Sequence, residues 1–209
     1  KLKAYIDPLS KVLNRETAIE KIRERLKNQT MNEECAFIVL DIDNFKNIND
    51  TFGHLYGDAV IAMVAGSIKS TLDSEDIIGR FGGDEFLVYI DNTKPEKMER
   101  KLENIRLAIL KMRIDKNDEK DISCSMGVTL GRGRVKYEDL FRQADSALYM
   151  AKTNGKNRFE YFNGEFIDKN ALTYTGIMTE EDENEEVSEN HDIIMVALEI
   201  ASKSTDSDN

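Results

Sequence analysis

Hydrophobic residues follow two different spacings along this chain. Some stretches carry them three and four positions apart, the period of a helix with one buried face, and these cover 14–26, 58–72 and 137–152. Other stretches are short apolar runs, several of them β-branched and aromatic, which are typical of buried strands, and these cover 36–40, 76–81, 85–90, 122–130 and 158–162. A further helix is predicted from Thr93 to Met112, because Thr93, Pro95 and Glu96 fit a capping box with proline in the first turn.

The order of these elements predicts the fold class. Gly82 and Gly83 separate two strand-like runs and predict a β-hairpin. Helices and strands otherwise alternate, so we expect an α/β (α+β) domain with a mixed central sheet that contains one antiparallel hairpin and is flanked by helices.

Composition narrows the class of protein. The chain has 209 residues, of which 40% are hydrophobic and 33% charged, as in a globular protein with room for one domain and extra segments. No apolar run approaches the roughly 20 residues of a membrane helix, and no secretory signal pattern is present, so we expect no membrane contact within this sequence. Cys35 and Cys124 lie in separate apolar runs, which favours reduced core thiols and a cytoplasmic location.

The net charge of −11 makes nucleic acid an improbable partner, since a phosphate backbone needs a basic surface. Much of this charge is local: residues 179–190 hold seven acids and no base. The charge therefore says little about a site in the rest of the chain.

Two acidic segments carry the candidate chemistry. Asp41-Ile42-Asp43 follows a buried run, and Asp84 and Glu85 follow the two glycines. If the hairpin pairs beside the first strand, Asp41 meets Asp84 and Glu85, and such carboxylates either take up protons or hold a cation. Oxygen ligands suit magnesium and hence a phosphate substrate, but a Gly-Gly-Asp hairpin is also an ordinary turn. The residues alone leave both interpretations open.

Five segments, in order, resemble the GGDEF family of diguanylate cyclases over about residues 7–161. They are Asp7-Pro8-Leu9-Ser10 with Asn14-Arg15, the run Asp41 to Asp50, Gly53-His54 with Gly57-Asp58, Arg80-Phe81-Gly82-Gly83-Asp84-Glu85-Phe86, and Ala144-Asp145 through Lys152 to Gly155-Lys156-Asn157. The resemblance implies a nucleotide-cyclase or polymerase-palm type of fold. It also implies magnesium, for which manganese can substitute.

The resemblance assigns roles to individual positions. It implies catalytic roles for Asp41, Asp84 and Glu85, and metal ligation by Asp41, the carbonyl of Ile42, Asp84 and Glu85. Which of Asp84 and Glu85 acts as the base stays open. The implied substrate-binding residues are Asn49 and Asp58 at guanine, and Phe45, Lys46, Gly82, Gly83, Lys152 and Lys156 near the phosphates.

Other motif residues have simpler interpretations. Phe81 and Phe86 are expected in the core, Asp43 and Asp50 are expected to orient loops, and His54 receives no catalytic role.

Two positions depart from the family pattern. Members often carry an inhibitory product site that begins with Arg-x-x-Asp, whereas the matching positions here read Asp73-Ser74-Glu75-Asp76. An acid in place of the arginine repels phosphate, so we expect no inhibition of this kind. Lys11 stands where the family commonly has glycine.

The activity that the resemblance implies is the condensation of two GTP molecules into cyclic di-GMP and two pyrophosphates, in bacterial second-messenger signalling. Each domain holds half of the site, so the active unit is a homodimer. Three alternatives are a catalytically silent GTP-binding regulatory domain, an enzyme that makes a mixed cyclic dinucleotide, and a polymerase-type palm. The presence of Asp41, Asp84 and Glu85 argues against a catalytically silent domain. Asp58 is a good partner for guanine, which argues against a mixed cyclic dinucleotide.

The expected domain boundaries follow from the same patterns. Residues 7–163 form the cyclase domain, preceded at 1–6 by the end of an upstream signalling helix. Residues 164–190 are an acidic linker, and 191–209 an amphipathic helix that begins a further domain, which weakly resembles a GAF sensory domain. Flanking sensory or effector domains are expected to supply the regulation.

Overall fold

The apolar run at 36–40 lies at the centre of a five-stranded sheet, as its continuous hydrophobicity predicts. The computed structural model describes residues 4–91, 95–113 and 121–164. In it the strands have the order β2-β3-β1-β4-β5. Their bounds are Glu34–Ile42 (β1), Ile77–Gly82 (β2), Glu85–Asp91 (β3), Cys124–Arg132 (β4) and Phe159–Tyr161 (β5). β1 pairs antiparallel with β3 and β4, whereas β4 and β5 are parallel, so the expected mixed sheet is confirmed.

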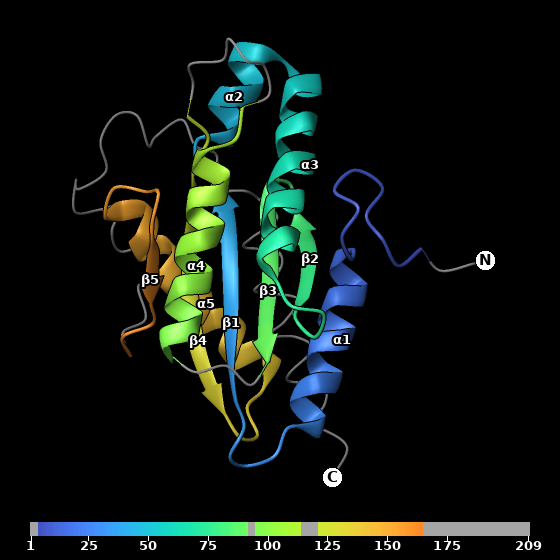
Figure 1. Ribbon diagram of the computed structural model, residues 1–209, viewed down its shortest axis with the longest axis vertical. Coiled ribbons are helices and arrows are strands. Elements are labelled where there is room, and N and C mark those ends of the chain that lie inside the picture. The colour runs from blue at the N-terminus through green and yellow to red at the C-terminus, as the bar shows by residue number, and fades with distance from the viewer. Residues whose placement is uncertain (1–3, 92–94, 114–120, 165–209) are drawn as a thin grey trace, which may run out of the picture. The chain divides into compact units, whose positions relative to one another are not determined.

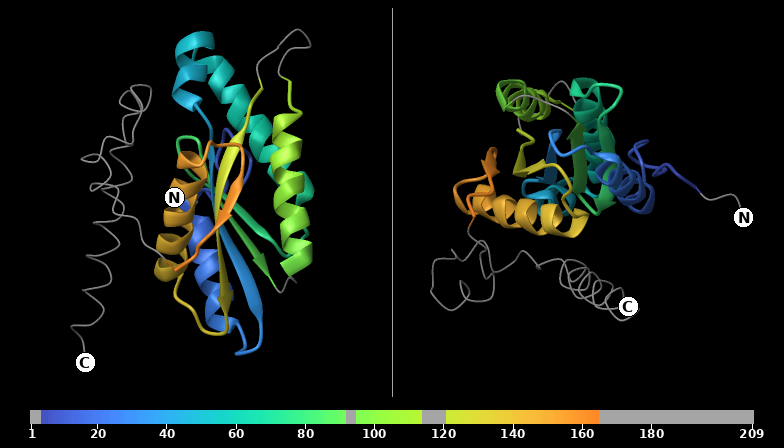
Figure 2. Two further views of the ribbon diagram at one scale, coloured as in Figure 1. Left: turned by 90° about the vertical axis from the view of Figure 1, so that its left-hand side faces the viewer. Right: turned by 90° about the horizontal axis from the view of Figure 1, so that it is seen from below.

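Helices cover both faces of this sheet. Their bounds are Arg15–Asn28 (α1), Phe45–Phe52 (α2), His54–Thr71 (α3), Pro95–Leu110 (α4) and Tyr137–Thr153 (α5). Figures 1 and 2 show α3 and α4 on one face, α1 and α5 on the other, and α2 beyond the end of β1. Four of the five helices match the predicted periodic stretches.

Helix α2 is a correction to the sequence prediction, which placed no helix between the strand at 36–40 and the helix at 58–72. Phe45, Ile48 and Phe52 do have helical spacing, but eight residues between Asn44 and Gly53 give too few periods to recognise. The N-cap residue of this helix is Asn44, whose φ of 56° lies in the left-handed region.

The alternation of side chains along β1 decides which helices each residue meets. Ala36, Ile38 and Leu40 belong to the core cluster that includes residues of α3 and α4. Phe37 points the other way and packs edge-on against Tyr137 of α5, with the ring centroids 5.6 Å apart. Asp41 has the same parity as Phe37, and so the β1 register directs its carboxylate to the side of α5.

Gly127 of β4 sets how closely α5 approaches the sheet. A Cβ at this position would lie 1.9 Å from the carbonyl oxygen of Ala144 and 2.2 Å from the nitrogen of Leu148, distances that no real side chain allows. Helix α5 therefore rests directly on the backbone of β4, and its C-terminal turn lies within reach of the end of β1.

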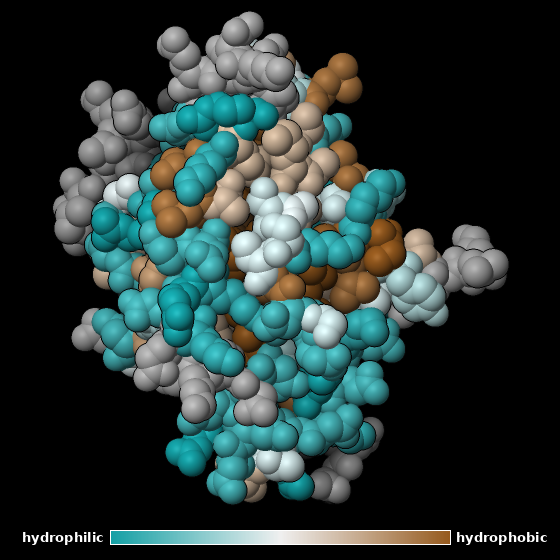
Figure 3. Space-filling model, in the orientation of Figure 1, coloured by the Kyte–Doolittle hydropathy of each residue, from teal (hydrophilic) through white to brown (hydrophobic). Residues whose placement is uncertain are grey.

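The outer edge of β2 is covered by the segment before α1. Leu13 forms a parallel bridge with Gly79, and the N–H of Arg80 donates to the carbonyl of Leu13 at 2.8 Å. Nearby Tyr5 and Ile6 remain 57% and 46% exposed. Figure 3 shows a mostly hydrophilic lower half on the face that it draws, with hydrophobic side chains gathered higher up, toward this segment.

Several expectations concern parts of the chain that the structure does not describe. These parts contain the capping residue Thr93, half of the proposed upstream segment 1–6, nearly all of the linker 164–190 and the whole of 191–209. Among the described residues, no helix is long and apolar enough to cross a membrane. Cys35 and Cys124 are buried free thiols, as predicted.

Lys11 has a φ of 58°, a backbone conformation that costs a residue with a Cβ about 1–2 kcal/mol. We therefore expect Lys11→Gly to raise the free energy of unfolding by about 0.5–1 kcal/mol, since the greater entropy of glycine in the unfolded chain offsets part of the relief. Urea unfolding followed by circular dichroism measures this change. Lys11→Ala is the control, because it removes the charge but keeps the strain. An equal gain from both variants would assign the effect to charge.

Candidate functional site

The antiparallel register places the two acidic segments side by side. Asp41 is the last residue but one of β1, and it pairs directly with Glu85, the first residue of β3. Asp84 lies in the two-residue turn immediately before Glu85, between the paired residues Gly82 and Glu85. The condition set by the sequence, that the hairpin pairs beside the first strand, is met.

Burial and like charges act together on Asp41. The residue is 7% exposed, and loss of hydration raises the pKa of its carboxyl to about 7. The ammonium of Lys152 opposes this rise in pKa, whereas the negative charges of Asp84 and Glu85 add to it. The Nζ atom of Lys152 lies 3.0 Å from Oδ2 of Asp41.

The oxygen atoms at this end of the sheet are of the kind that a hard divalent cation takes as ligands. The buried carboxylate of Asp41 is influenced by the negative charges of Asp84 and Glu85. It is also in contact with the ammonium of Lys152. Carboxylate oxygens and the carbonyl of Ile42 are the kind of ligands that Mg²⁺ takes. Within the described residues, however, no three His, Cys, Asp or Glu side chains are grouped closely enough to hold one ion together.

Asp43 acts as an anchor between loops. Its two carboxylate oxygens accept hydrogen bonds from the hydroxyls of Ser123 (2.7 Å) and Ser125 (2.6 Å) and from the N–H of Asn157 (2.9 Å). The turn after β1 is thereby tied both to β4 and to the loop after α5. The predicted loop-orienting role of Asp43 agrees with these contacts.

The same turn is also held by a lysine. The ammonium of Lys156 donates to Oδ1 of Asn44 at 2.8 Å, and Asn44 immediately precedes the first residue of α2. Phe45 is half-buried against the core, and Lys46 is exposed. The predicted phosphate-binding residues Phe45, Lys46 and Lys156 therefore meet at the N-terminus of α2, where backbone N–H groups favour anions.

The predicted guanine-binding residues meet at the corner between α2 and α3. Oδ1 of Asn49 lies against Gly57, where a Cβ would be only 1.9 Å away, and Cζ of Phe45 would be 3.2 Å away. Asp58 follows Gly57 and is exposed. Asn49, Asp58 and Phe45 are thus brought to one corner.

The side chain of Arg80 stabilises the hairpin turn between β2 and β3. The guanidinium of Arg80 donates to the carbonyl oxygen of Gly83 through Nε (3.0 Å) and Nη2 (2.7 Å), and Nη1 lies 3.3 Å from Asp7. Burial opposes the ionisation of Asp7, but hydrogen bonds from Ser10 and the charge of Arg80 outweigh it and hold the pKa of Asp7 below its usual value. Sequence reasoning missed this link, since 73 residues separate Asp7 from Arg80.

The loop at 73–76 is held by ion pairs within the chain. The ammonium of Lys101 in α4 contacts the carboxylates of Asp73, at 2.9 Å, and Asp76. The Asp76 side chain is 3% exposed, and it also accepts the N–H of Asp73. On the other side Glu75 pairs with Arg25 of α1 at 2.7 Å. The acidic residues at the positions of the family's product site are therefore engaged internally.

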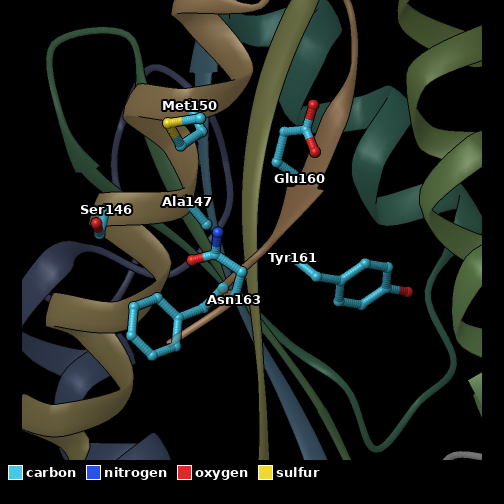
Figure 4. A pocket seen from close by; sticks show the side chains of 7 residues that line it. Ser146, Ala147, Met150, Glu160, Tyr161 and Asn163 are labelled. Atoms are coloured by element: carbon cyan, nitrogen blue, oxygen red, sulfur yellow. The ribbon is translucent and has the colours of Figure 1, made fainter. Parts of the chain in front are cut away.

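A small hollow lies away from these residues. Figure 4 shows it between α5, which carries Ser146, Ala147 and Met150, and the strand that carries Glu160 and Tyr161. Its volume is about 100 Å³, whereas pockets for drug-sized ligands usually exceed roughly 300 Å³. None of its lining residues is a predicted site residue, and a nucleotide is too large for it.

Comparison with known proteins identifies the family. The family model described as "Diguanylate cyclase, GGDEF domain" matches residues 4–158, and the chain belongs to this family. It is 39% identical over 160 residues to diguanylate cyclase DgcP of Pseudomonas aeruginosa, covering 76% of this chain and 24% of DgcP. It is 35% identical over 159 residues to diguanylate cyclase DosC of Escherichia coli K12, covering 74% of this chain and 34% of DosC. The chain thus spans a quarter to a third of the length of these relatives.

Solved structures agree with the fold. The GGDEF domain of DgcB from Caulobacter crescentus, in complex with cyclic di-GMP, is similar with a TM-score of 0.70 and 27% identity, covering 78% of this chain and 96% of that one. Diguanylate cyclase SiaD of Pseudomonas aeruginosa, in complex with its activator SiaC, has a TM-score of 0.71 and 32% identity, covering 76% and 62%. The mixed sheet flanked by helices is therefore the fold of GGDEF domains.

The contacts of Asp43 predict its contribution to stability. We expect Asp43→Ala to lower the free energy of unfolding by about 2–3 kcal/mol, because the buried hydroxyl of Ser125, the half-buried hydroxyl of Ser123 and one N–H lose their acceptor. Chemical unfolding followed by circular dichroism measures the loss. Asp50→Ala is the matched control: Asp50 is exposed on α2, and its replacement is expected to change stability by less than about 0.5 kcal/mol. Equal effects of the two variants would contradict the anchoring role.

Proposed function

We propose that this protein is a diguanylate cyclase, which condenses two GTP molecules into cyclic di-GMP and two pyrophosphates. The observation that carries the proposal is the pairing of Asp41 with Glu85, which sets a buried carboxylate beside the acids of the hairpin turn. The similarity to DgcP and DosC supports the same activity. The reaction serves bacterial second-messenger signalling, in a cytoplasmic domain.

The proposed metal ligands are Asp41, the carbonyl of Ile42, Asp84 and Glu85. Magnesium, or manganese in its place, supplies charge neutralisation at the phosphates and favours ionisation of the attacking 3′-hydroxyl. Asp84 and Glu85 lie on the hairpin turn, where either carboxylate can accept the proton of that hydroxyl. Arg80 fixes the carbonyl of Gly83 and so holds this turn in one shape.

The remaining site residues are proposed to bind GTP. A carboxylate at Asp58 and an amide at Asn49 complement the N1–H and N2–H donors of guanine, which adenine lacks as a pair. The N-terminus of α2 at Phe45 and Lys46 faces the phosphates, and Lys152 and Lys156 add positive charge. Gly82 and Gly83, both exposed, leave the backbone of the turn accessible to the substrate.

One domain offers one such set of residues, and the product contains two nucleotides. We therefore propose a homodimer in which two GTP-loaded domains face each other, each supplying one 3′-hydroxyl and one α-phosphate. Segments outside 7–163 are proposed to control this encounter: the end of a signalling helix at 1–6, the acidic linker at 164–190, and a further domain that begins at 191–209.

The decisive test is to incubate the full 209-residue chain at high concentration with GTP and Mg²⁺ and to identify the products by mass spectrometry. We expect cyclic di-GMP from the wild type and a loss of more than about 100-fold in rate for Asp84→Ala/Glu85→Ala. The control Glu20→Ala/Glu24→Ala removes the same charge from the exposed side of α1 and should keep full activity.

Two other outcomes would contradict the proposal. Magnesium-dependent GTP binding without product, even after a fused coiled coil enforces dimerisation, would assign the chain to the second function, a catalytically silent GTP-binding regulatory domain. A mixed dinucleotide formed from GTP and ATP would contradict the proposed guanine selectivity of Asp58.

A second prediction concerns the product. Asp73 presents a negative charge where the family's product site carries an arginine, and Asp76, at the position of the motif's aspartate, is like Asp73 already paired with Lys101. We expect no saturable binding of cyclic di-GMP to the loop at 73–76 below about 10 µM by isothermal titration calorimetry. Tight binding that Asp76→Ala abolishes, without a loss of folded structure by circular dichroism, would show this prediction to be wrong. Asp73→Ala, at an 82% exposed side chain, provides a second variant with less risk to folding.

A further inference from the structure

Lys152 holds the carboxylate on which the proposed metal site depends. Its ammonium lies 3.0 Å from Oδ2 of Asp41, and the side chains of Lys152 and Asp41 are 32% and 10% exposed. Asp41 can therefore exchange this partner only for another cation, because little water reaches it. A divalent ion bound at Asp41 would lie within a few ångströms of the ammonium and be repelled by it.

Lys152 can exchange Asp41 for another partner without movement of the backbone. It lies in the last turn of α5, whose end is closed by hydrogen bonds from the N–H of Asn154 to Met150 and from the N–H of Lys156 to Ala151. Beyond it, Asn157 is tied to Asp43. A lysine side chain has a four-carbon flexible stem, so the ammonium can swing away from Asp41 to another anion within its reach.

The neighbouring Lys156 provides a contrast within the same site. Its ammonium donates to the neutral amide oxygen of Asn44 at 2.8 Å, whereas the ammonium of Lys152 contacts the carboxylate of Asp41. Two lysines thus flank the turn after β1, but in the described geometry Lys152 is the one that neutralises Asp41.

We propose that Lys152 couples metal binding to nucleotide binding. Without nucleotide, its ammonium occupies Asp41 and competes with a divalent cation; a bound triphosphate offers the ammonium a second anionic partner and releases Asp41 to the metal. Metal and nucleotide therefore bind together, and by linkage each strengthens the binding of the other. This inference rests on the proposed function, since it takes Asp41 as a metal ligand and a triphosphate as the substrate.

The coupling is tested by metal binding in the absence of nucleotide. Free Mn²⁺ is measured by electron paramagnetic resonance as it is titrated into the full chain. We expect Lys152→Met to bind Mn²⁺ at least about tenfold more tightly than the wild type, because the competing charge is gone. Lys152→Arg keeps a competing charge and should stay close to the wild type. Lys156→Met removes the same charge one turn away and should change the affinity less than about threefold.

A second measurement separates competition from structural damage. The affinity for a GTP analogue with a methylene group between the α- and β-phosphates is measured by calorimetry with Mg²⁺ present. Lys152→Met should bind the analogue at least about tenfold more weakly while it binds Mn²⁺ more tightly. A variant that is merely misfolded would lose both affinities.

Three outcomes would overturn the inference: an unchanged or weaker Mn²⁺ affinity of Lys152→Met, an equal gain in Lys156→Met, or a gain that persists when Asp41→Asn is added. Its failure is distinct from that of the proposed function, which is measured by product formation. Wild-type synthesis of cyclic di-GMP with no gain in Lys152→Met would retain the cyclase and refute the coupling. A higher Mn²⁺ affinity of Lys152→Met without formation of cyclic di-GMP by the wild type would support the coupling and refute the cyclase.

Discussion

The antiparallel pairing of β1 with β3 is the constraint on which the rest of this site depends. It fixes Asp41 opposite Glu85, and with it the turn that carries Asp84, so that carboxylates from two distant parts of the sequence share one end of the sheet. Burial, and after it the charges of Asp84 and Glu85, raise the pKa of Asp41, so the ionised carboxylate is unfavourable there. The fold tolerates it because the sheet beneath is held by buried apolar side chains on both faces.

Around these acids, the supporting contacts come from side chains that need not touch a substrate. Asp43 ties the turn after β1 to β4 and to the loop after α5, and Arg80 ties the hairpin turn to Asp7. These links join the segment before α1, the turns after β1 and β2, and the loop after α5. A site assembled from several loops needs such cross-links, because loops by themselves keep many conformations.

Two lysines lie beside the acidic end of the sheet. In the described geometry Lys152 neutralises part of the acidic end of the sheet, and Lys156 holds Asn44 at the start of α2. Both lysines project from the last turn of α5 or the loop after it, whose position is set by the close contact of that helix with Gly127. The packing of α5 on β4 is thus a condition for the electrostatics at β1.

The sequence by itself determined the elements, the family and the identity of the acids, because apolar periodicity and a contiguous motif are local properties of the chain. It also indicated that Phe81 and Phe86 are core residues, which are 3% and 0% exposed. Short α2 was missed, since eight residues give too few periods. Only the tertiary structure decided that Lys152 contacts Asp41, that Arg80 reaches Asp7, and that Lys101 holds Asp73 and Asp76. These pairs are separated by 25 to 111 residues, and strand register and helix packing alone bring them together.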